Sequence, residues 1–550
     1  MSHFSFLRSG WFILLSIFFL NACNGPSPVS NERKSGLDTL FVAEDLKRPL
    51  LIDSTLCDSI AKSNPALAEY CRNARLFYSA RNWSPAWYGS DSWREHAAFL
   101  MQLVGTSSLE GISDTFPALL EVQDDMSRYT GIGEFNARLD VMLTSAFFWY
   151  AEKAWNGLPE KTSRALDWFL PRLHKDSRTW LDSALTQQPD AGLLSKAVFI
   201  QYYRLRSEIQ VYDSLRKRGG WPTLNPVKLP LYYGDTGSDV IALKKSLFAH
   251  GDLVKLPDDD SFDSTLTVAL IHFQQRHGLK PDGTCGKNVV KALNVTVEDR
   301  ITQMLLNLER CRWMPNALPD RFLLVNIPEF TLHLIDDRVE KEVMPVVVGK
   351  DVHQTVSFSG SMRTVVFHPY WVVPSGILYD EIIPAAIRST SYIKRNNMEV
   401  VGGSGGKIPS SSVNWKNYRR SGFPYKVQQR PGPDNPLGEV KFLFPNNYSI
   451  YLHDSPSKSL FGKEKRTFSH GCIRVGDARR LAEFVLADEG WSVQAVDSAF
   501  KTRKERWVKL KRDLPVYIVY FTSWVDQKGV LHFREDIYGR DERLRTELLK

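Results

Sequence analysis

Cys472 is the residue of this chain best suited to covalent chemistry. His453 precedes it by nineteen residues, and the surrounding stretch reads Ser469-His470-Gly471-Cys472-Ile473-Arg474. A cysteine nucleophile needs a base that takes its proton and N–H donors that stabilise an oxyanion. We expect His453 to be this base, in an ion pair that lowers the thiol pKa.

The oxyanion donors are expected in the backbone at Gly471 and Cys472. Glycine has no side chain, so the chain can approach a substrate closely at this point. A lone cysteine with one upstream histidine is also compatible with a buried and inert thiol. From spacing alone, both interpretations stay open.

A strand and a helix must position these residues. Residues 448–452 alternate as a strand that leads directly into His453. Downstream, Gly476 and Asp477 predict the capped start of a helix, whose apolar face carries Leu481, Phe484 and Val485. We expect the dipole of this helix to favour an anion at Cys472.

A β-rich domain is predicted over 321–550. Strand-like apolar stretches occur at 330–334, 344–348, 365–373, 440–444, 516–524 and 530–533. The interval 375–437 is instead rich in Gly, Ser, Pro and Asn, and opens with a predicted helix over 380–388. Long insertions in compact domains are commonly lids or binding loops, so we expect a flap beside the active site. A disordered surface excursion is the alternative.

The preceding part of the chain has helical periodicity. Residues 64–225 predict an α-helical scaffold domain, 226–298 a small module of three short helices, and 299–320 a helical connector. The predicted fold class is therefore multidomain α+β. It combines the scaffold, the module and a β-sandwich-like catalytic domain with a lid insertion.

Composition is that of a globular protein with several domains, since 43% of the 550 residues are hydrophobic and 24% are charged. The net charge of +8 comes from 70 basic and 62 acidic residues without a long basic run. This excess gives no argument for a nucleic-acid partner, but it suits an anionic polymer or a lipid surface.

Residues 1–22 predict a signal peptide. Arg8 precedes an apolar run over 11–20, which is too short to cross a bilayer of about 30 Å as a permanent helix. The run leads into Leu20-Asn21-Ala22-Cys23, which resembles the lipobox of bacterial lipoproteins. This resemblance implies a lipid anchor at Cys23, and a plain secretory peptide is the alternative.

The segment 23–63 is expected to be a flexible tether, because it opens with Gly, Pro and Ser. Everything after Cys23 should then face the periplasm. Residue 24 is Asn, whereas Asp at this position often marks retention in the inner membrane of enteric bacteria. The lack of Asp here favours the outer membrane.

Four cysteines are not assigned to lipid or chemistry: Cys57, Cys71, Cys285 and Cys311. An exported protein can keep disulfides, and the simplest of the three connectivities joins 57 with 71 and 285 with 311. The cysteines form no C-x-x-C pattern, so a zinc ribbon is not expected.

The small helical module resembles the peptidoglycan-binding domain of cell-wall enzymes. Its opening matches G-D-x-G-x-x-V-x-x-L at 234–243, and its middle matches F-Q-x-x-x-G-L-x-x-D-G at 273–283. The resemblance implies binding to peptidoglycan, whereas a helical spacer without a ligand is the alternative.

The region of the nucleophile resembles the YkuD-type catalytic domain of L,D-transpeptidases, the cysteine enzymes of peptidoglycan. The motifs are H-D-x-P-S at 453–457 and S-H-G-C-I-R-V at 469–475. Phrases at 431–438, 441–446, 450–454 and 536–541 are similar to the long subgroup, which has a scaffold domain, a peptidoglycan-binding domain and a lid insertion.

This resemblance implies roles for the residues around the nucleophile. Cys472 is then the nucleophile, His453 the base, and the main-chain carbonyl of Asp454 the group that orients the imidazole. Cys472 would attack the bond between diaminopimelate and a terminal D-alanine, and an amine of a second stem peptide would resolve the thioester. No cofactor is expected, and carbapenem-type inhibitors are expected to acylate Cys472.

Four further residues are candidates for substrate binding. Arg474 holds a substrate carboxylate or forms a structural ion pair. His470 binds substrate or is simply packed. Trp371 and Tyr451 line the pocket wall or belong to the core.

The implied partners are peptidoglycan stem peptides and glycan, together with a membrane reached through Cys23. Two rival functions stay open. One is an L,D-carboxypeptidase or crosslink hydrolase that gives the same acyl-enzyme to water. The other is a wall-binding lipoprotein in which catalysis is secondary.

Overall fold

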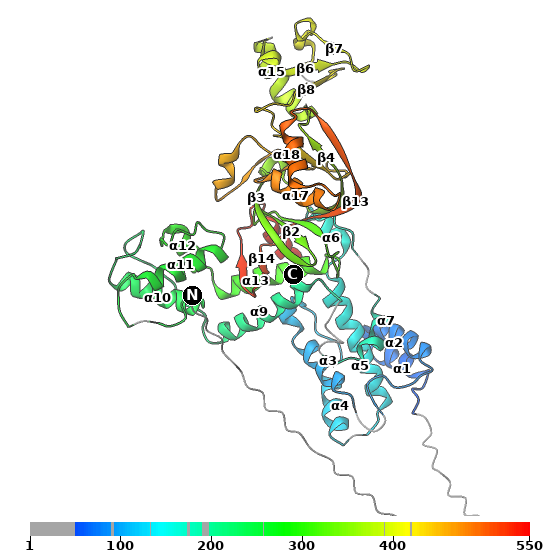
Figure 1. Cartoon of the computed structure of the whole chain (residues 1–550). Coiled ribbons are helices and arrows are strands. Elements are labelled where there is room, and N and C mark those ends of the chain that lie inside the picture. Colours follow the sequence, from blue (N-terminus) through cyan, green and yellow to red (C-terminus); the bar gives the residue numbers. More distant parts are fainter. Residues whose placement is uncertain are drawn as a thin grey trace, which may run out of the picture. The chain divides into compact units, whose positions relative to one another are not determined.

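The computed structural model describes residues 50–549, except 90–92, 133, 173–175, 190–196, 257, 390 and 419–420. These residues belong to one compact unit that begins at Leu50, and Figure 1 labels its elements along the chain. The predicted signal peptide, Cys23 and the tether up to residue 49 lie outside the described residues. Across the described ranges, no helix combines the length and the apolar composition needed to cross a membrane.

The folded part of the chain begins earlier than the sequence predicts. Ile52 is buried, and helix α1 (Leu56–Ser63) buries Cys57 and Ile60 in the main core. The prediction of a tether is therefore wrong for residues 52–63. Helix α1 has only about two turns, and so short a segment gives no sustained apolar period that would distinguish it from a tether.

The scaffold is helical, as predicted. Its central helix α5 (Ala137–Ala151) is buried from Leu139 to Ala151, and a helix that is covered on all sides belongs in a core. The other helices of this region are α2 (Ala68–Ala80), α3 (Glu95–Gly105), α4 (Leu119–Ile132), α6 (Glu160–Ala165), α7 (Ser177–Ala184) and α9 (Ile200–Lys217), with short turns η1 (Pro65–Leu67), η2 (Ser107–Glu110) and η3 (Glu152–Asn156).

The suggested disulfides are not formed. Cys57 and Cys71 are both free thiols in the main core, where burial raises the pKa of Cys57 to about 12. Cys285 is a free thiol in the core of the small module, whereas Cys311 lies in the main core. Neither suggested pair is formed: Cys57 and Cys71 share a core but remain thiols, and Cys285 and Cys311 lie in different cores.

The three-helix module is confirmed and has a core of its own. It contains α10 (Ser238–Ala249), α11 (Ser264–Arg276) and α12 (Lys287–Leu293). The predicted apolar stripes are buried, with Leu243, Leu270 and Phe273 fully covered. Helix α13 (Val297–Arg312) follows and contributes Met304 and Leu308 to the main core, so the predicted connector is a structural element rather than a spacer.

The β-rich domain is built on one nine-stranded sheet. The strand order is β11-β3-β12-β10-β9-β4-β13-β1-β2, and β2 also pairs with β3, so the sheet closes on itself. Its strands are β1 (Phe322–Asn326), β2 (Thr331–Asp336), β3 (Val339–Gly349), β4 (Phe358–Phe367), β9 (Val440–Leu443), β10 (Leu452–His453), β11 (Thr467–Ser469), β12 (Ile473–Val475) and β13 (Arg506–Val519). The fold class is therefore multidomain α+β, as predicted.

Two predicted strands are interrupted. The stretch 365–373 is divided because β4 ends at Phe367 and His368 has a positive φ of 44°, which ends the extended backbone. The stretch 516–524 divides into the end of β13 and the start of β14 (Ser523–Val525), which forms a hairpin with β15 (Leu531–Phe533). Helices α17 (Ala478–Ala487), α18 (Val493–Lys501) and α19 (Arg540–Leu548) complete this part of the chain.

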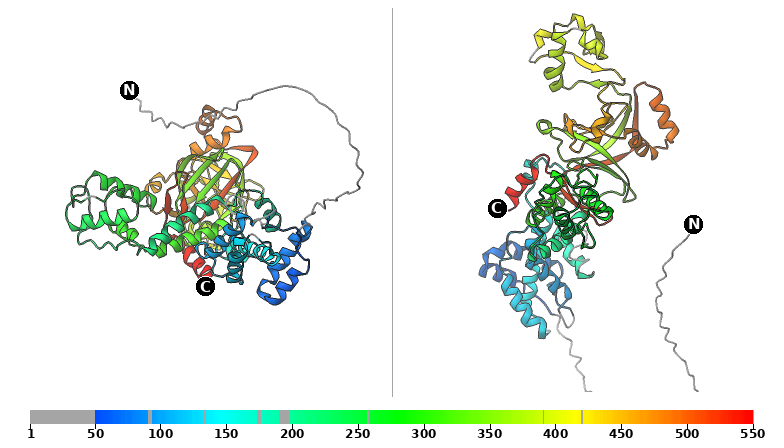
Figure 2. Two further views of the ribbon diagram at one scale, coloured as in Figure 1. Left: turned by 90° about the horizontal axis from the view of Figure 1, so that it is seen from below. Right: turned by 90° about the vertical axis from the view of Figure 1, so that its left-hand side faces the viewer.

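The insertion at 375–437 is a folded subdomain, which Figure 2 shows as a unit of short helices and strands. It has its own apolar core, which includes Ile383, Ile393 and Val427. The elements are β5 (Trp371–Val372), α14 (Ser375–Ile377), η5 (Leu378–Ile382), α15 (Ile383–Arg388), α16 (Tyr392–Arg395), β6 (Met398–Val401), β7 (Lys407–Ile408), η6 (Ser410–Ser412), η7 (Trp415–Tyr418) and β8 (Lys426–Gln429). For the described residues, the alternative of a disordered excursion is wrong.

Candidate active site

Two adjacent parallel strands carry the candidate pair, because His453 ends β10 and Cys472 directly precedes β12. In the parallel register His453 is level with Arg474, so Cys472 lies two residues along the neighbouring strand from the level of His453. The nineteen-residue separation in sequence therefore becomes a separation of one strand.

The imidazole of His453 is buried and oriented. Its Nδ1 lies 2.6 Å from the main-chain carbonyl oxygen of Asp454. A carbonyl can only accept, so Nδ1 carries the proton and Nε2 is the basic nitrogen. Burial, with a smaller contribution from Arg474, lowers the pKa of His453 to about 4. At neutral pH the ring is uncharged and able to accept a proton.

Asp454 is itself held in place through its carboxylate. Oδ2 accepts the N–H of Glu439 at 3.0 Å, and Oδ1 accepts Lys458 Nζ at 2.6 Å. Gly438 packs against this carboxylate, since a Cβ at Gly438 would lie 2.2 Å from Oδ2. The backbone carbonyl that orients His453 is thus fixed by its own side chain.

The thiol of Cys472 is not in an ion pair with His453. Its Sγ donates to the carbonyl of Ser449 at 3.5 Å, and the described residues contain no hydrogen bond between Sγ and the His453 ring. Burial raises the pKa of Cys472, although Tyr451 opposes this effect through its backbone and its hydroxyl. The resting pair is therefore a neutral thiol and a neutral imidazole, and the predicted ion pair is wrong for this state.

The predicted help from a helix dipole is also not supported. Asp477 caps α17 as predicted, because its carboxylate accepts the N–H of Arg480 at 2.9 Å. However, the three-residue strand β12 separates Cys472 from this helix. Three extended residues span roughly 10 Å, and the dipole effect falls off within the first turn of a helix.

The backbone of the nucleophile loop offers one N–H for an oxyanion. The N–H of Gly471 donates to Ser469 Oγ at 3.1 Å, so it is not available as predicted. Within the described part of the chain, the N–H of Cys472 has no acceptor. We therefore assign the candidate oxyanion donor to Cys472, while Gly471 adopts a φ of 109° that favours glycine.

The structure places two of the four substrate-binding candidates in the site. Arg474 has a buried Nε without a hydrogen-bond partner among the described residues, so no structural ion pair occupies that atom. Tyr451 packs against the core of the insertion, and its ring centroid lies 5.6 Å from that of His453.

The other two candidates have different surroundings. Trp371 is buried within the core of the insertion, which favours the packing role over the pocket wall. His470 is partly exposed, and its Nε2 lies 3.5 Å from Glu381 of the insertion. The insertion thus approaches the nucleophile loop at His470 and packs on Tyr451, whose ring neighbours His453.

Sequence reasoning missed Ser449, Ser469 and Thr355. Ser469 and Thr355 hold the nucleophile loop, and Thr355 donates to the carbonyl of Gly471 at 2.8 Å. Ser469 was within the quoted motif and could have been found there. Thr355 lies 116 residues from Gly471, so no spacing in the sequence could indicate it.

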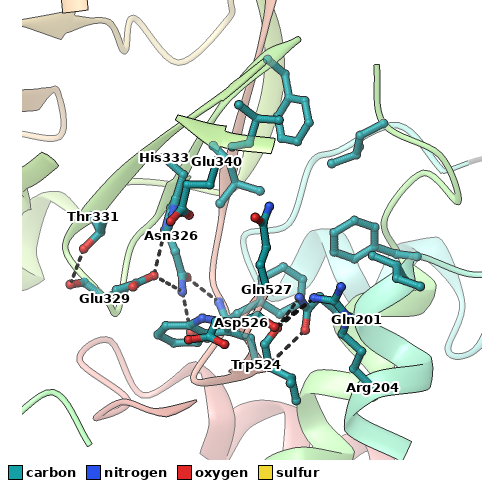
Figure 3. Close-up of a pocket in the computed structure, with 18 of the residues that line it drawn as sticks. Gln201, Arg204, Asn326, Glu329, Thr331, His333, Glu340, Trp524, Asp526 and Gln527 are labelled. Atoms are coloured by element: carbon teal, nitrogen blue, oxygen red, sulfur yellow. Dashed lines mark hydrogen bonds and ion pairs between the residues drawn. The ribbon is translucent and has the colours of Figure 1, made fainter. Parts of the chain in front are cut away.

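A cavity of about 540 Å³ is separate from this site. Figure 3 shows it between the start of α9, with Gln201 and Arg204, and strand β2, which carries His333, with Glu329 in the turn before β2. Burial alone would lower the pKa of His333, but Glu329 and Glu340 raise it to about 10. His333 is thus paired with the carboxylates of Glu329 and Glu340. Neither Cys472 nor His453 lines the cavity.

Three parts of the chain match the models of known protein domains. Residues 320–518 match the model of an L,D-transpeptidase catalytic domain, and they include Cys472 and His453. The chain carries an L,D-transpeptidase catalytic domain. Upstream, residues 72–209 match a scaffold domain and 236–293 match a peptidoglycan binding domain.

One curated relative is an L,D-transpeptidase from Haemophilus influenzae. It is 30% identical over 248 residues, which are 45% of this chain and 50% of the relative. The chain thus spans about half the length of the curated relative it matches.

Two solved structures are also similar to parts of the chain. An L,D-transpeptidase from Xylanimonas cellulosilytica is 14% identical, covers 54% of this chain and 100% of its own, and has a TM-score of 0.18. One from Stackebrandtia nassauensis is 13% identical, covers 54% and 96%, and has a TM-score of 0.20.

Proposed function

We propose that this protein crosslinks diaminopimelate residues of neighbouring peptidoglycan stem peptides through a thioester at Cys472. The proposal is supported by the neutral His453, whose Nε2 is the basic nitrogen, one strand from Cys472. It is also supported by the matches to an L,D-transpeptidase catalytic domain and a peptidoglycan binding domain.

The first half-reaction forms the acyl-enzyme. His453 Nε2 takes the thiol proton as Sγ attacks the carbonyl between diaminopimelate and D-alanine. The Cys472 N–H stabilises the oxyanion. The C–N bond then breaks, His453 returns the proton to the leaving amine, and D-alanine departs.

The second half-reaction transfers the acyl group. An amine of a second stem peptide attacks the thioester, and His453 accepts its proton. A new C–N bond forms, the C–S bond breaks, and the proton returns to Sγ. Arg474, with its unpartnered buried Nε, binds a carboxylate of a stem peptide in this proposal.

The folded lid is the observation that favours an amine over water as acceptor. Its core packs on Tyr451, and Glu381 approaches His470 of the nucleophile loop. A covered site limits access of water to a thioester, whereas an open site would favour hydrolysis. We therefore prefer crosslinking over the carboxypeptidase or hydrolase alternative.

The deciding experiment incubates the chain from residue 24 onward with tetrapeptide muropeptides and analyses the products by mass. Crosslinked dimers that disappear with Cys472→Ala are the expected result. Tripeptide without dimer would identify a carboxypeptidase. Lack of any turnover would refute both enzymatic functions and leave a wall-binding protein.

For the N-terminus we propose a lipid anchor at Cys23, with the outer membrane as its location. Support comes from the lipobox-like stretch 20–23 and from Asn24. Several acyl chains on one residue anchor a protein stably. After membrane fractionation, the Cys23→Ala variant should be found in the soluble periplasmic fraction. The same distribution for the variant and the wild type would refute the anchor.

A further inference from the structure

The nucleophile loop is held from outside by one buried hydroxyl. Thr355 Oγ1 donates to the carbonyl of Gly471 at 2.8 Å and accepts the N–H of Gly349 at 3.0 Å. Thr355 is completely buried. Since its donor and an acceptor position are both used, the hydroxyl has a fixed orientation.

Fixing the carbonyl of Gly471 also fixes the N–H of Cys472. Both groups belong to the same peptide unit, which is planar and trans, so they point in opposite directions. Gly471 alone would not hold this plane, because its φ of 109° lies in a region where glycine is conformationally free. The hydrogen bond from Thr355 therefore aims the candidate oxyanion donor.

Ser469 holds the same loop from within. Its Oγ accepts the N–H of Gly471 at 3.1 Å and donates to the carbonyl of Cys472 at 2.5 Å. Thr355 and Ser469 thus bind different groups of the loop. The orientation of the peptide between Gly471 and Cys472 depends on Thr355.

The C-terminal segment holds Thr355. Arg540 is buried and donates to the carbonyl of Thr355 at 3.0 Å. Its guanidinium lies over the rings of Tyr520 and Tyr538, at 4.8 and 5.0 Å from their centroids. Tyr538 also donates its hydroxyl to the carbonyl of Gly349. Tyr538 and Arg540 therefore hold both Gly349 and Thr355, the two residues joined by the Thr355 hydroxyl.

The scaffold holds the other side of the Thr355 segment. The N–H of Phe169 donates to the carbonyl of Ser357 at 2.7 Å, and the N–H of Ser357 donates to the carbonyl of Asp167 at 2.9 Å. The scaffold thus adds a short strand-like pairing two residues from Thr355. This contact gives the scaffold a physical connection to the nucleophile loop.

We propose that Thr355 is a positioning residue that aims the N–H of Cys472 at the oxyanion, with Arg540 and the scaffold holding Thr355 in place. The proposal deepens the proposed function, since it concerns acyl transfer to the same thiol. It does not depend on which wall peptide is the substrate.

The first test is Thr355→Val, which keeps the shape and removes the hydroxyl. Removing one oxyanion donor altogether lowers kcat roughly 10²–10³-fold. A donor that is still present but wrongly oriented should lower kcat by a smaller factor, about 10–100-fold. KM for the tetrapeptide donor should change less than about twofold. Thr355→Ser keeps the hydroxyl and should restore most of kcat.

Two rate measurements distinguish a wrongly oriented N–H of Cys472 from a misfolded protein. Acylation of Cys472 by p-nitrophenyl acetate forms an oxyanion, whereas alkylation by iodoacetamide does not. Thr355→Val should slow acylation as much as it slows kcat and leave alkylation nearly unchanged. Both rates are measured against Cys472→Ala and do not require wall peptides, so the result stands even if the proposed function fails.

Thr144→Val is the matched control. Thr144 is a buried scaffold residue whose hydroxyl also has two partners, Trp87 at 2.9 Å and Tyr78 at 2.7 Å. Its loss should lower the melting temperature without slowing acylation. The proposal is overturned if Thr355→Val acylates at the wild-type rate, or if it loses alkylation to the same extent as acylation.

Discussion

The imidazole Nδ1 of His453 lies 2.6 Å from the carbonyl oxygen of the next residue, Asp454. This contact decides which nitrogen of the base can receive a proton. The carboxylate of Asp454 contributes indirectly, because its bonds to Glu439 and Lys458 keep that carbonyl in place. A base oriented by the backbone keeps its direction without a second buried charge.

The low pKa of His453, about 4, predicts the acidic limit of activity. The base is neutral above this value, so kcat/KM should decline only as the pH approaches about 4, rather than near 6.5. A pH profile of the acylation rate checks this expectation. A decline centred near 6.5 would show that burial does not control the base.

The same shift predicts a pH dependence of stability. The pKa is lowered in the folded state, so the unfolded chain binds more protons between pH 6.5 and about 4. The contribution of His453 is fully present above pH 6.5 and is lost as the pH falls to about 4. Thermal unfolding across this window should depend less on pH in His453→Asn than in the wild type.

Cys472 should react as a thiol of raised pKa when no substrate is bound. Burial raises its pKa and Tyr451 partly counteracts this effect. The rate of alkylation by iodoacetamide should therefore keep rising at pH values at which an ordinary cysteine is already fully ionised. Tyr451→Phe removes the hydroxyl that lowers the pKa, so it should react more slowly at a given pH. A faster reaction would contradict this assignment.

A carbapenem should acylate Cys472. Attack of Sγ opens the lactam ring without a leaving group, so the protein should gain the mass of one whole drug molecule. Intact-mass measurement checks this, and Cys472→Ala should show no gain. An adduct that persists in the variant would place the reactive group elsewhere.

Arg474→Lys should weaken donor binding. The buried Nε without a partner is suited to a carboxylate, and lysine cannot form the planar two-point contact of a guanidinium. We expect KM for the tetrapeptide to rise about tenfold, equivalent to ~1.4 kcal/mol. Iodoacetamide alkylation should persist. A normal KM would favour a structural role for Arg474.

Gly438→Ala should disturb His453 through Asp454. A Cβ there would lie 2.2 Å from Asp454 Oδ2, at a φ of 59° that already costs a non-glycine residue about 1–2 kcal/mol. Gly422→Ala is the control, because its φ of 78° is similar but no atom lies within 4 Å of its Cβ. Both should lower the melting temperature, and only Gly438→Ala should abolish acylation.

The sequence predicted elements well where a local pattern determines them. The module helices bury Leu243 and Leu270 because a 3.6-residue period leaves one face apolar wherever the helix lies. Asp477 caps α17 because its carboxylate bonds a neighbouring N–H. Local signals failed at α1, whose burial depends on the helices that cover it.

The protonation of the site could not be predicted from spacing. The expected ion pair between Cys472 and His453 assumed that proximity controls both pKa values. In the structure, burial raises one and lowers the other, so both groups are neutral. The burial of a side chain depends on all the elements that pack around it, so a local sequence motif cannot predict it.

By itself, the sequence indicated the candidate nucleophile, the candidate base and the kinds of domain that the family models match, because their motifs consist of neighbouring residues. Only the tertiary structure decided how the site is held. The hydroxyl of Thr355 reaches Gly471 across 116 residues, and Tyr451 packs against the core of the insertion. Such contacts depend on strand register and packing, which bring distant residues together only when the whole domain folds.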